Sequence, residues 1–188
     1  AFSTSETTSY IYIDTDDNAD SVVAKLTPIA RQHSLHGFTT LMRHTKYADN
    51  VRTGRYAIKS GEGAFTVLRH LKNGMQEPVN LTIPTVRTIE RLSAELAKHL
   101  MLDSTTLANA LKNDTVCQKY GYDTTTIACM FIPNTYDIYW NVNMNKLLDR
   151  MKKESNNFWN ADRKAKAQRL KLSPNEVITL ASIVDEET

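Results

Sequence analysis

The stretch VNLTIP, residues 79–84, decides the fold of this chain. Apolar side chains at its first, third and fifth positions alternate with polar ones, as in a half-buried strand, and the proline closes it. Strand and helix patterns are mixed before this stretch, whereas only helical spacing follows it. The sequence therefore predicts an α+β fold, in which a small α/β subdomain precedes a mainly helical part and the boundary lies at residue 84.

The part before the boundary begins with a polar segment, residues 1–9, which we interpret as a tether or as the cut edge of a longer chain. Aromatic and β-branched residues then indicate strands, and helical spacing indicates helices, the first capped by Asn18 or Asp20. Gly74 stands where a helix would end in a left-handed glycine. The predicted strands are 10–13 and 55–58, and the predicted helices are 22–30, 38–42 and 64–74.

The part after the boundary begins with an apolar stripe that has charged residues on its opposite side, which predicts a surface helix. Residues 120–143 have no regular pattern, and no further strand is expected. The basic residues between 162 and 171 indicate either a solvated helix face or a surface attracted to an anionic wall or membrane. The helices expected here are 88–100, 104–112, 144–151 and one that begins at Ser173.

The composition excludes several classes of function. Lys and Arg number 23 against 21 Asp and Glu, so the chain lacks the basic excess of a nucleic-acid-binding domain. Cys117 and Cys129 lack the paired spacing of a zinc site, and they form either one disulfide or two buried thiols. No apolar run is long enough to span a membrane. We therefore expect no nucleic-acid partner and no metal.

The last helix has a complete start signal, with Ser173 as N-cap, Pro174 at the first helical position and Glu176 three residues after the cap. Apolar residues then recur at helical spacing, which predicts that one face of this helix is buried. The residues of that face are Val177, Leu180, Ala181 and Val184.

Three acids, Asp185, Glu186 and Glu187, end this helix, and helical geometry turns each by about 100° from the one before. Only Glu187 continues the apolar stripe, because its neighbours one turn earlier are Ile183 and Val184 and its neighbour two turns earlier is Leu180. Burial of a carboxyl group beside apolar side chains disfavours its charged form and raises its pKa. The pattern therefore favours Glu187 as a general acid, although acids near a helix end are also common as plain surface residues.

The sequence LASIVDEET, residues 180–188, closely resembles the L-A-S-I-[IV]-E-K-E-T signature of the YceG-like family, also called the MltG family, of endolytic murein transglycosylases. The second Glu of that signature is the catalytic one, and it corresponds to Glu187. Asp185 stands in place of the first Glu, and Glu186 stands in place of the usual Lys.

Two further segments carry the same resemblance. FIPNTY, residues 131–136, is similar to the family's F-x-P-D-T-[YW] segment, with Asn134 in place of Asp, and TGRY, residues 53–56, is similar to its A-G-x-Y segment. Ala128 and Cys129 stand where the family has Glu-Gly, so this chain lacks that carboxylate.

The resemblance implies a domain organisation and a location. Residues 10–84 would be a LysM-like subdomain that binds glycan, and residues 85–188 would be the first portion of the transglycosylase domain, which extends beyond this chain. The family is anchored in the inner membrane by a helix that is absent here, with its catalytic part facing the periplasm. Its partners would be peptidoglycan glycan strands and peptidoglycan synthases.

The resemblance also implies a reaction, namely cleavage of the β-1,4 bond between N-acetylmuramic acid and N-acetylglucosamine with formation of 1,6-anhydro ends. The alternative is a non-catalytic module that only binds peptidoglycan. Members of the family have also carried the label aminodeoxychorismate lyase, a pyridoxal-phosphate enzyme. The sequence offers neither a cofactor-binding Lys nor a phosphate cup for such chemistry, so no cofactor is expected.

Overall fold

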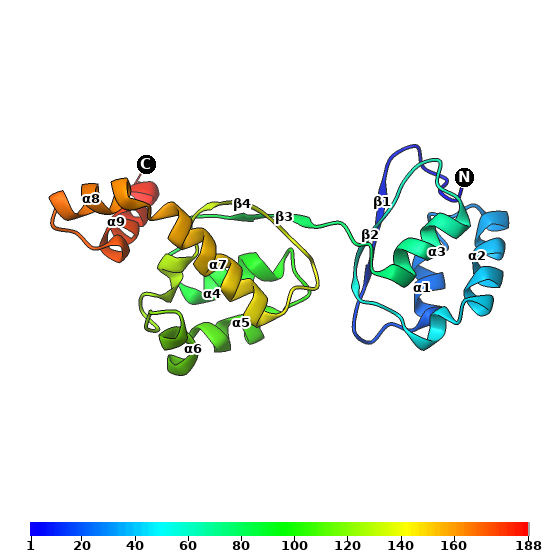
Figure 1. The fold of residues 1–188 in the computed structure, drawn as a ribbon, viewed down its shortest axis with the longest axis horizontal. Coiled ribbons are helices and arrows are strands. Elements are labelled where there is room, and N and C mark those ends of the chain that lie inside the picture. Colours follow the sequence, from blue (N-terminus) through cyan, green and yellow to red (C-terminus); the bar gives the residue numbers. More distant parts are fainter. Residues whose placement is uncertain (188) are drawn as a thin grey trace. The chain divides into compact units, whose positions relative to one another are not determined.

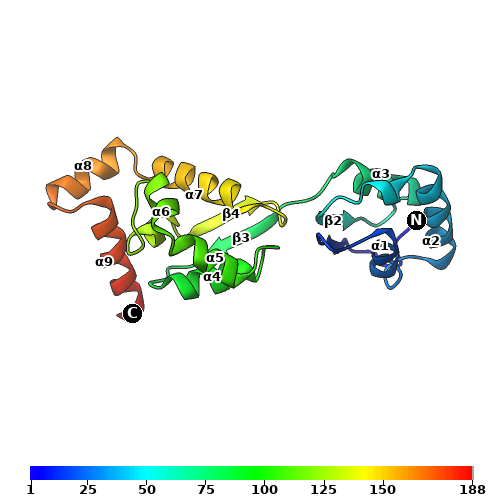
Figure 2. The ribbon, with the colours of Figure 1, turned by 90° about the horizontal axis from the view of Figure 1, so that it is seen from below.

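The computed structural model of the chain describes residues 1–187, and they form two compact units. The first unit holds Ala1–Val79 together with the short segment Tyr139–Asn141. The second holds Asn80–Ile138 and the residues from Val142 onward. The architecture is α+β, as the sequence predicts. Both units contain helices, and the four strands form two separate two-stranded sheets among residues 1–187. Both units are shown in Figures 1 and 2.

The sheet of the first unit consists of β1 (Ser9–Ile13) and β2 (Gly54–Ile58), which pair antiparallel with Ile11 opposite Tyr56. Figures 1 and 2 both show the helices of this unit on one side of that pair. The helices are α1 (Ala19–Leu26), α2 (Gln32–His44) and α3 (Ala64–Asn73), with a short 3₁₀ helix, η1 (Tyr47–Asp49), before β2.

The core of the first unit lies between this sheet and the helices. Alternate residues of β1 point inward, because successive side chains of a strand face opposite sides, while each helix contributes its apolar stripe. The side chains that are fully buried there include Ile13, Val22, Leu26, Phe38, Ile58, Val67 and Leu71. A single hydrophobic cluster therefore joins all three helices to the sheet.

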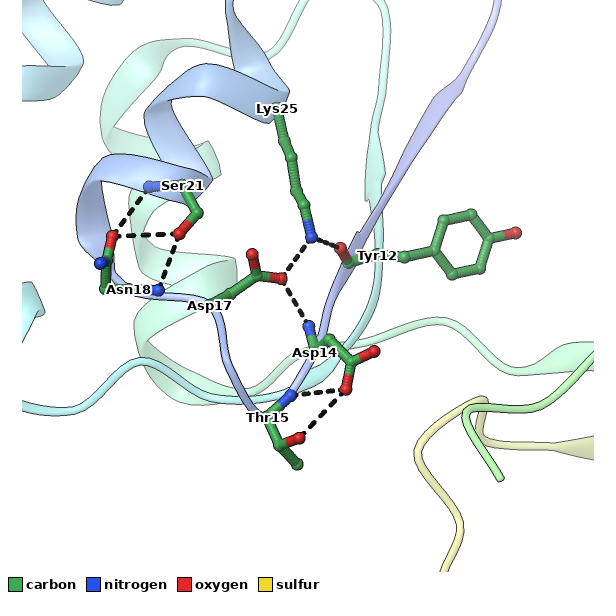
Figure 3. A network of polar contacts seen from close by, with 7 residues as sticks. All are labelled: Tyr12, Asp14, Thr15, Asp17, Asn18, Ser21 and Lys25. Atoms are coloured by element: carbon green, nitrogen blue, oxygen red, sulfur yellow. Dashed lines mark hydrogen bonds and ion pairs between the residues drawn. The ribbon is translucent and has the colours of Figure 1, made fainter. Parts of the chain in front are cut away.

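A polar network fixes the connection between β1 and α1 (Figure 3). Asp17 accepts hydrogen bonds from the backbone N–H of Asp14, at 2.7 Å, and from Lys25, whose ammonium also donates to the carbonyl of Tyr12 at 2.7 Å. Asn18 and Ser21 form a reciprocal capping box, with 2.9 Å contacts in both directions. Asn18, rather than Asp20, is thus the cap that starts α1.

The second unit contains the other sheet, in which β3 (Val79–Ile83) pairs with β4 (Asn134–Ile138). Its first helices are α4 (Ile89–Ala97), α5 (Ser104–Leu111) and α6 (Asp114–Lys119), followed by the 3₁₀ helix η2 (Ile127–Met130). The remaining helices are α7 (Met144–Phe158), α8 (Ala161–Arg169) and α9 (Pro174–Glu187). The side chains that cap α4 to α8 are Thr88, Asp103, Asn113, Asn143 and Asn160.

Several predictions of element extent were wrong. The strand β4 lies inside residues 120–143, where no regular element was expected, because only Tyr136 and Ile138 turn inward and pairing with β3 fixes the rest. The helix α2 extends over Gln32–His44 rather than 38–42, and α1 ends at Leu26, before Pro28. Gly74 does take the left-handed conformation that ends α3, with φ of 66°, as predicted.

The domain boundary is placed at residue 84 by the sequence pattern, while the compact units divide between Val79 and Asn80. Among residues 1–187, no helix is long and apolar enough to cross a membrane.

Candidate functional site

The candidate site is a groove on the second unit, with a volume of about 270 Å³. Three segments form it: the loop between β3 and α4, the η2 region with the residues that follow it, and one face of α9. Both apolar and hydroxyl-bearing side chains line its walls. The lining residues include Arg87, Thr125, Cys129, Phe131, Ile178 and Thr179.

The helix α9 begins where the sequence predicts. The backbone N–H of Ser173 donates to the Glu176 carboxylate at 2.7 Å, and the N–H of Glu176 donates to the Ser173 hydroxyl at 3.3 Å. This capping box and Pro174 at the first position together fix the helix start. Residues of α9 that line the groove are therefore held on a regular helix rather than on a loop.

The face that α9 buries is not the predicted one. Ser182 is its buried residue, with the hydroxyl donating to the carbonyl of Thr179 at 2.7 Å. Leu180 and Val184 are instead 48% and 63% exposed. The reason is that α9 packs on η2 through the side that holds Thr179 and Ser182. Within residues 1–187, the more apolar side with Leu180 and Val184 remains exposed to solvent.

Glu187, the predicted catalytic residue, is the last described residue of α9, and its side chain is exposed. Thr188, which completes the family motif, lies outside the described residues. The apolar neighbours that were expected to desolvate Glu187 are themselves exposed, by 42% for Ile183 and more for Leu180 and Val184. The predicted burial of Glu187 beside apolar side chains is therefore wrong within residues 1–187, and its catalytic role stays a prediction that rests on the family motif.

Glu187 is not among the residues that line the groove, but it follows one of them on the same helix. Ile183 lines the groove, and Glu187 follows it by four residues, which is about one helical turn. The adjacent Glu186 pairs with Arg87, at 2.9 Å between Nη1 and Oε2. Arg87 also donates from Nη2 to the carbonyl of Ser182 at 3.4 Å. A residue from the β3–α4 loop thus holds the last turn of the helix that carries Glu187.

The sequence pattern does not distinguish Arg87, because it is one basic residue in an irregular segment. It also lines a second hollow, of about 380 Å³, which shares Thr125 and Ala128 with the groove. The second hollow adjoins the groove at Arg87 and is also lined by Glu90 and Lys112, which form an ion pair.

Cys129 lines the groove beside α9. Its thiol contacts the Thr179 hydroxyl at 3.9 Å and donates to the carbonyl of Asn175 at 3.7 Å. Burial raises the pKa of the Cys129 thiol, which keeps it protonated and poorly nucleophilic. Cys117 is also buried, and both cysteines are free thiols. The sequence left open a disulfide or two buried thiols, and the structure contains the two buried thiols.

The groove brings two of the three family-like segments together. Phe131 and Pro133 come from FIPNTY, while Ile178, Ser182 and Ile183 come from α9. Ala128, which stands where the family has Glu, lines the same groove. The third segment, TGRY, belongs to the first unit, where Tyr56 is buried and its hydroxyl donates to the carbonyl of Arg52 at 3.1 Å.

A family model described as the YceG-like family matches residues 11–188, which is nearly the whole chain. The chain belongs to the YceG-like family. The part of the chain that the family model matches includes both segments that line the groove.

Within residues 1–187 there is no cluster of three or more His, Cys, Asp or Glu side chains able to hold a metal ion.

A crystal structure of a YceG-like protein from Listeria monocytogenes resembles this chain, with a TM-score of 0.50 and 16% sequence identity. The similarity covers 98% of this chain and 66% of that protein, so the YceG-like chain described here spans less than two thirds of its relative. At this identity the likeness concerns the fold. No curated protein matched the chain.

Proposed function

We propose that this YceG-like chain is the front part of an endolytic peptidoglycan transglycosylase, and that Glu187 is its catalytic acid. The observation that carries the proposal is that the two motif segments line one groove, and that Glu187 follows the groove residue Ile183 by about one turn of α9. Family membership supports the same reading, because the motif that ends α9 is the one in which the family places its catalytic Glu.

The groove has the chemistry that a sugar chain requires. The hydroxyl groups of Thr85, Thr125 and Thr179 can exchange hydrogen bonds with sugar hydroxyls and amides, while Phe131 and Ile178 offer apolar surface to ring faces. Binding in the groove would place a glycosidic bond near the end of α9.

The reaction needs a single proton donor and acceptor. Glu187 gives its proton to the glycosidic oxygen, and the bond from that oxygen to C1 of N-acetylmuramic acid breaks. The C6 hydroxyl of the same sugar then attacks C1 and returns its proton to the carboxylate, which leaves a 1,6-anhydro end. A hydrolase would need a second carboxylate to act as nucleophile or to activate water. The internal hydroxyl removes that requirement.

The proposal extends to the whole protein and its location. The first unit would be LysM-like and would bind glycan, and the second unit would begin the catalytic domain. The protein would be anchored in the inner membrane, with the catalytic part in the periplasm, where it meets nascent glycan strands and peptidoglycan synthases. No cofactor enters the reaction.

The test is digestion of purified sacculi with the complete gene product, followed by mass spectrometry of the soluble fragments. The wild-type protein should release fragments ending in 1,6-anhydro-N-acetylmuramic acid, and Glu187→Gln should release none. Glu186→Gln, which removes the neighbouring carboxylate, should keep measurable activity. Full activity in Glu187→Gln would refute the assignment, and binding to sacculi without any release would favour a non-catalytic binding module.

A further inference from the structure

The outer face of the first unit's sheet carries exposed aromatic side chains. In β1 the residues Ile11 and Ile13 point into the core, so Tyr10 and Tyr12 face the other way, and they are 40% and 42% exposed. Figure 3 shows the Tyr12 ring directed away from the polar network around Asp17. Two large rings thus stand on one face, two residues apart along the strand.

A third ring is brought to this face from far along the sequence. Trp140 belongs to the first unit through the segment Tyr139–Asn141, and its ring lies 5.2 Å from that of Tyr12 in an edge-on arrangement, at 70°. The next residue anchors the segment: Asn141 accepts from Gln76 at 3.0 Å and donates to the hydroxyl and carbonyl of Thr53 at 3.0 and 3.2 Å. Side-chain hydrogen bonds of the neighbouring Asn141 therefore hold Trp140 in a partly exposed position.

The ring of Tyr10 is held as well. Arg55 lies opposite Tyr12 in the strand register, and its guanidinium sits 3.6 Å from the centre of the Tyr10 ring. The same guanidinium donates from Nη1 to the carbonyl of Pro78 at 2.7 Å, which limits its movement. The Tyr10 hydroxyl in turn donates to Glu77 at 3.4 Å. Rings that are fixed in advance lose little conformational entropy when a ligand binds.

We propose that this aromatic face, defined as Tyr10, Tyr12 and Trp140 with Arg55, binds the uncharged sugar rings of a β-1,4-linked N-acetylhexosamine chain. The C–H faces of a pyranose ring pack on the negative π faces of aromatic side chains, while its edge hydroxyls remain in water. The inference deepens the proposed function, because it places a glycan-binding surface on the first unit, but it does not require cleavage.

The charges around the aromatic face argue against an anionic ligand. Lys59 pairs with Glu77 at 2.8 Å, and the Arg55 guanidinium is engaged by Tyr10 and by the carbonyl of Pro78. Single-stranded nucleic acids also stack on aromatic residues, but they need cations that are available to neutralise phosphates. Both cations named here already have partners, and the Glu77 carboxylate would repel a phosphate.

The experiment is a fluorescence titration with the hexamer of β-1,4-linked N-acetylglucosamine. It uses the Trp159→Phe background, so that Trp140 is the remaining tryptophan within residues 1–188. Saturable change in Trp140 emission is expected, and Tyr12→Ser should weaken binding about tenfold or more, equivalent to about 1.4 kcal/mol. The matched control is Phe65→Ser, since Phe65 is an aromatic residue of α3 that is 61% exposed and lies outside the aromatic face. It should bind as the background does.

Several outcomes would overturn the inference. One is the absence of a saturable response. Another is that Tyr12→Ser and Phe65→Ser bind the hexamer equally well, while both variants keep the circular dichroism spectrum of the background protein. A third is sedimentation showing that Tyr12→Ser dissociates a dimer, which would make the aromatic face a contact between copies of this chain. A binding response in a protein that releases no 1,6-anhydro fragments would refute the proposed reaction alone, whereas release without a response would refute the aromatic face alone.

Discussion

The Arg87 guanidinium contacts the Glu186 carboxylate at 2.9 Å, one residue before Glu187. Arg87 comes from the loop after β3, and it also donates to the carbonyl of Ser182 in α9. Where the family motif has Lys, this chain has an acid that pairs with a loop arginine. The end of α9 is therefore fixed by a contact between segments that are far apart in sequence.

This ion pair can be tested by exchanging its charges. Arg87→Glu and Glu186→Arg should each put like charges together and speed hydrogen exchange of the backbone amides in the last turn of α9. The double exchange should restore the slow rate. Both partners are about 40% exposed, with side-chain values of 40% and 43%, so each single change should alter the free energy of unfolding by less than about 1 kcal/mol. Mass spectrometry of the peptide covering 178–187 provides the measurement. Equal exchange in all four proteins would show that Arg87 does not hold the helix end.

The two cysteines should react slowly in the folded protein. Burial raises the pKa of both thiols, and nearby Asp114 and Asp123 act in the same direction at Cys117. Since the thiolate is the reactive form, iodoacetamide at pH 7.5 should modify both residues more slowly in the native protein than in protein unfolded by urea. Intact-protein mass spectrometry over time measures this. Rapid single labelling of native protein, lost in Cys129→Ser, would mean that the groove exposes a reactive thiolate.

The buried tyrosines Tyr47 and Tyr56 form a matched pair with opposite expectations. The Tyr56 hydroxyl donates to the carbonyls of Arg52 and Thr53, and burial raises its pKa to about 12. Tyr47 is equally buried, yet its hydroxyl has no hydrogen-bond partner among the described residues. Tyr56→Phe should therefore cost about 1 kcal/mol of unfolding free energy, whereas Tyr47→Phe should be neutral or stabilising by a similar amount. Urea unfolding of both variants decides, and a larger loss for Tyr47→Phe would contradict this assignment of partners.

The contribution of Asp17 to stability should depend on pH. Burial opposes its ionisation, but hydrogen bonds from Lys25 and from the backbone of Asp14 outweigh burial and hold its pKa below the ordinary value of 3.8. A carboxyl whose pKa is lower in the folded state stabilises fully above its unfolded pKa and loses this effect as pH falls through the folded value. The network is expected to contribute about 1–2 kcal/mol at neutral pH.

The comparison is between wild type and Asp17→Asn. Their melting temperatures should differ at pH 7, and the difference should shrink steadily as the pH falls below 3.8, the ordinary pKa. Glu6→Gln serves as the control, since Glu6 is an exposed acid of the N-terminal segment. A difference that is independent of pH would mean that the geometry of the Asp17 side chain matters and its charge does not.

Local sequence signals determined most of the fold. The alternation in VNLTIP gave β3, the cap and proline at Ser173 and Pro174 gave the start of α9, and Gly74 gave the end of α3. Each of these elements is specified by residues within a few positions of one another, so the pattern predicts it without knowledge of the rest of the chain. The family motif was equally visible, because it is a contiguous run of residues.

The tertiary structure decided what pairs and what is buried. β4 exists because it meets β3, and Trp140 reaches the first unit because Asn141 bonds to Thr53 and Gln76. Helical periodicity shows that a helix has an apolar side, but not which neighbour will cover it. α9 packs on η2 through Thr179 and Ser182 and leaves Leu180 and Val184 exposed, and only long-range packing could decide that. The sequence alone thus pointed to Glu187, whereas the folded chain supplied the groove that is lined by earlier residues of the same helix, and the arginine that contacts this helix.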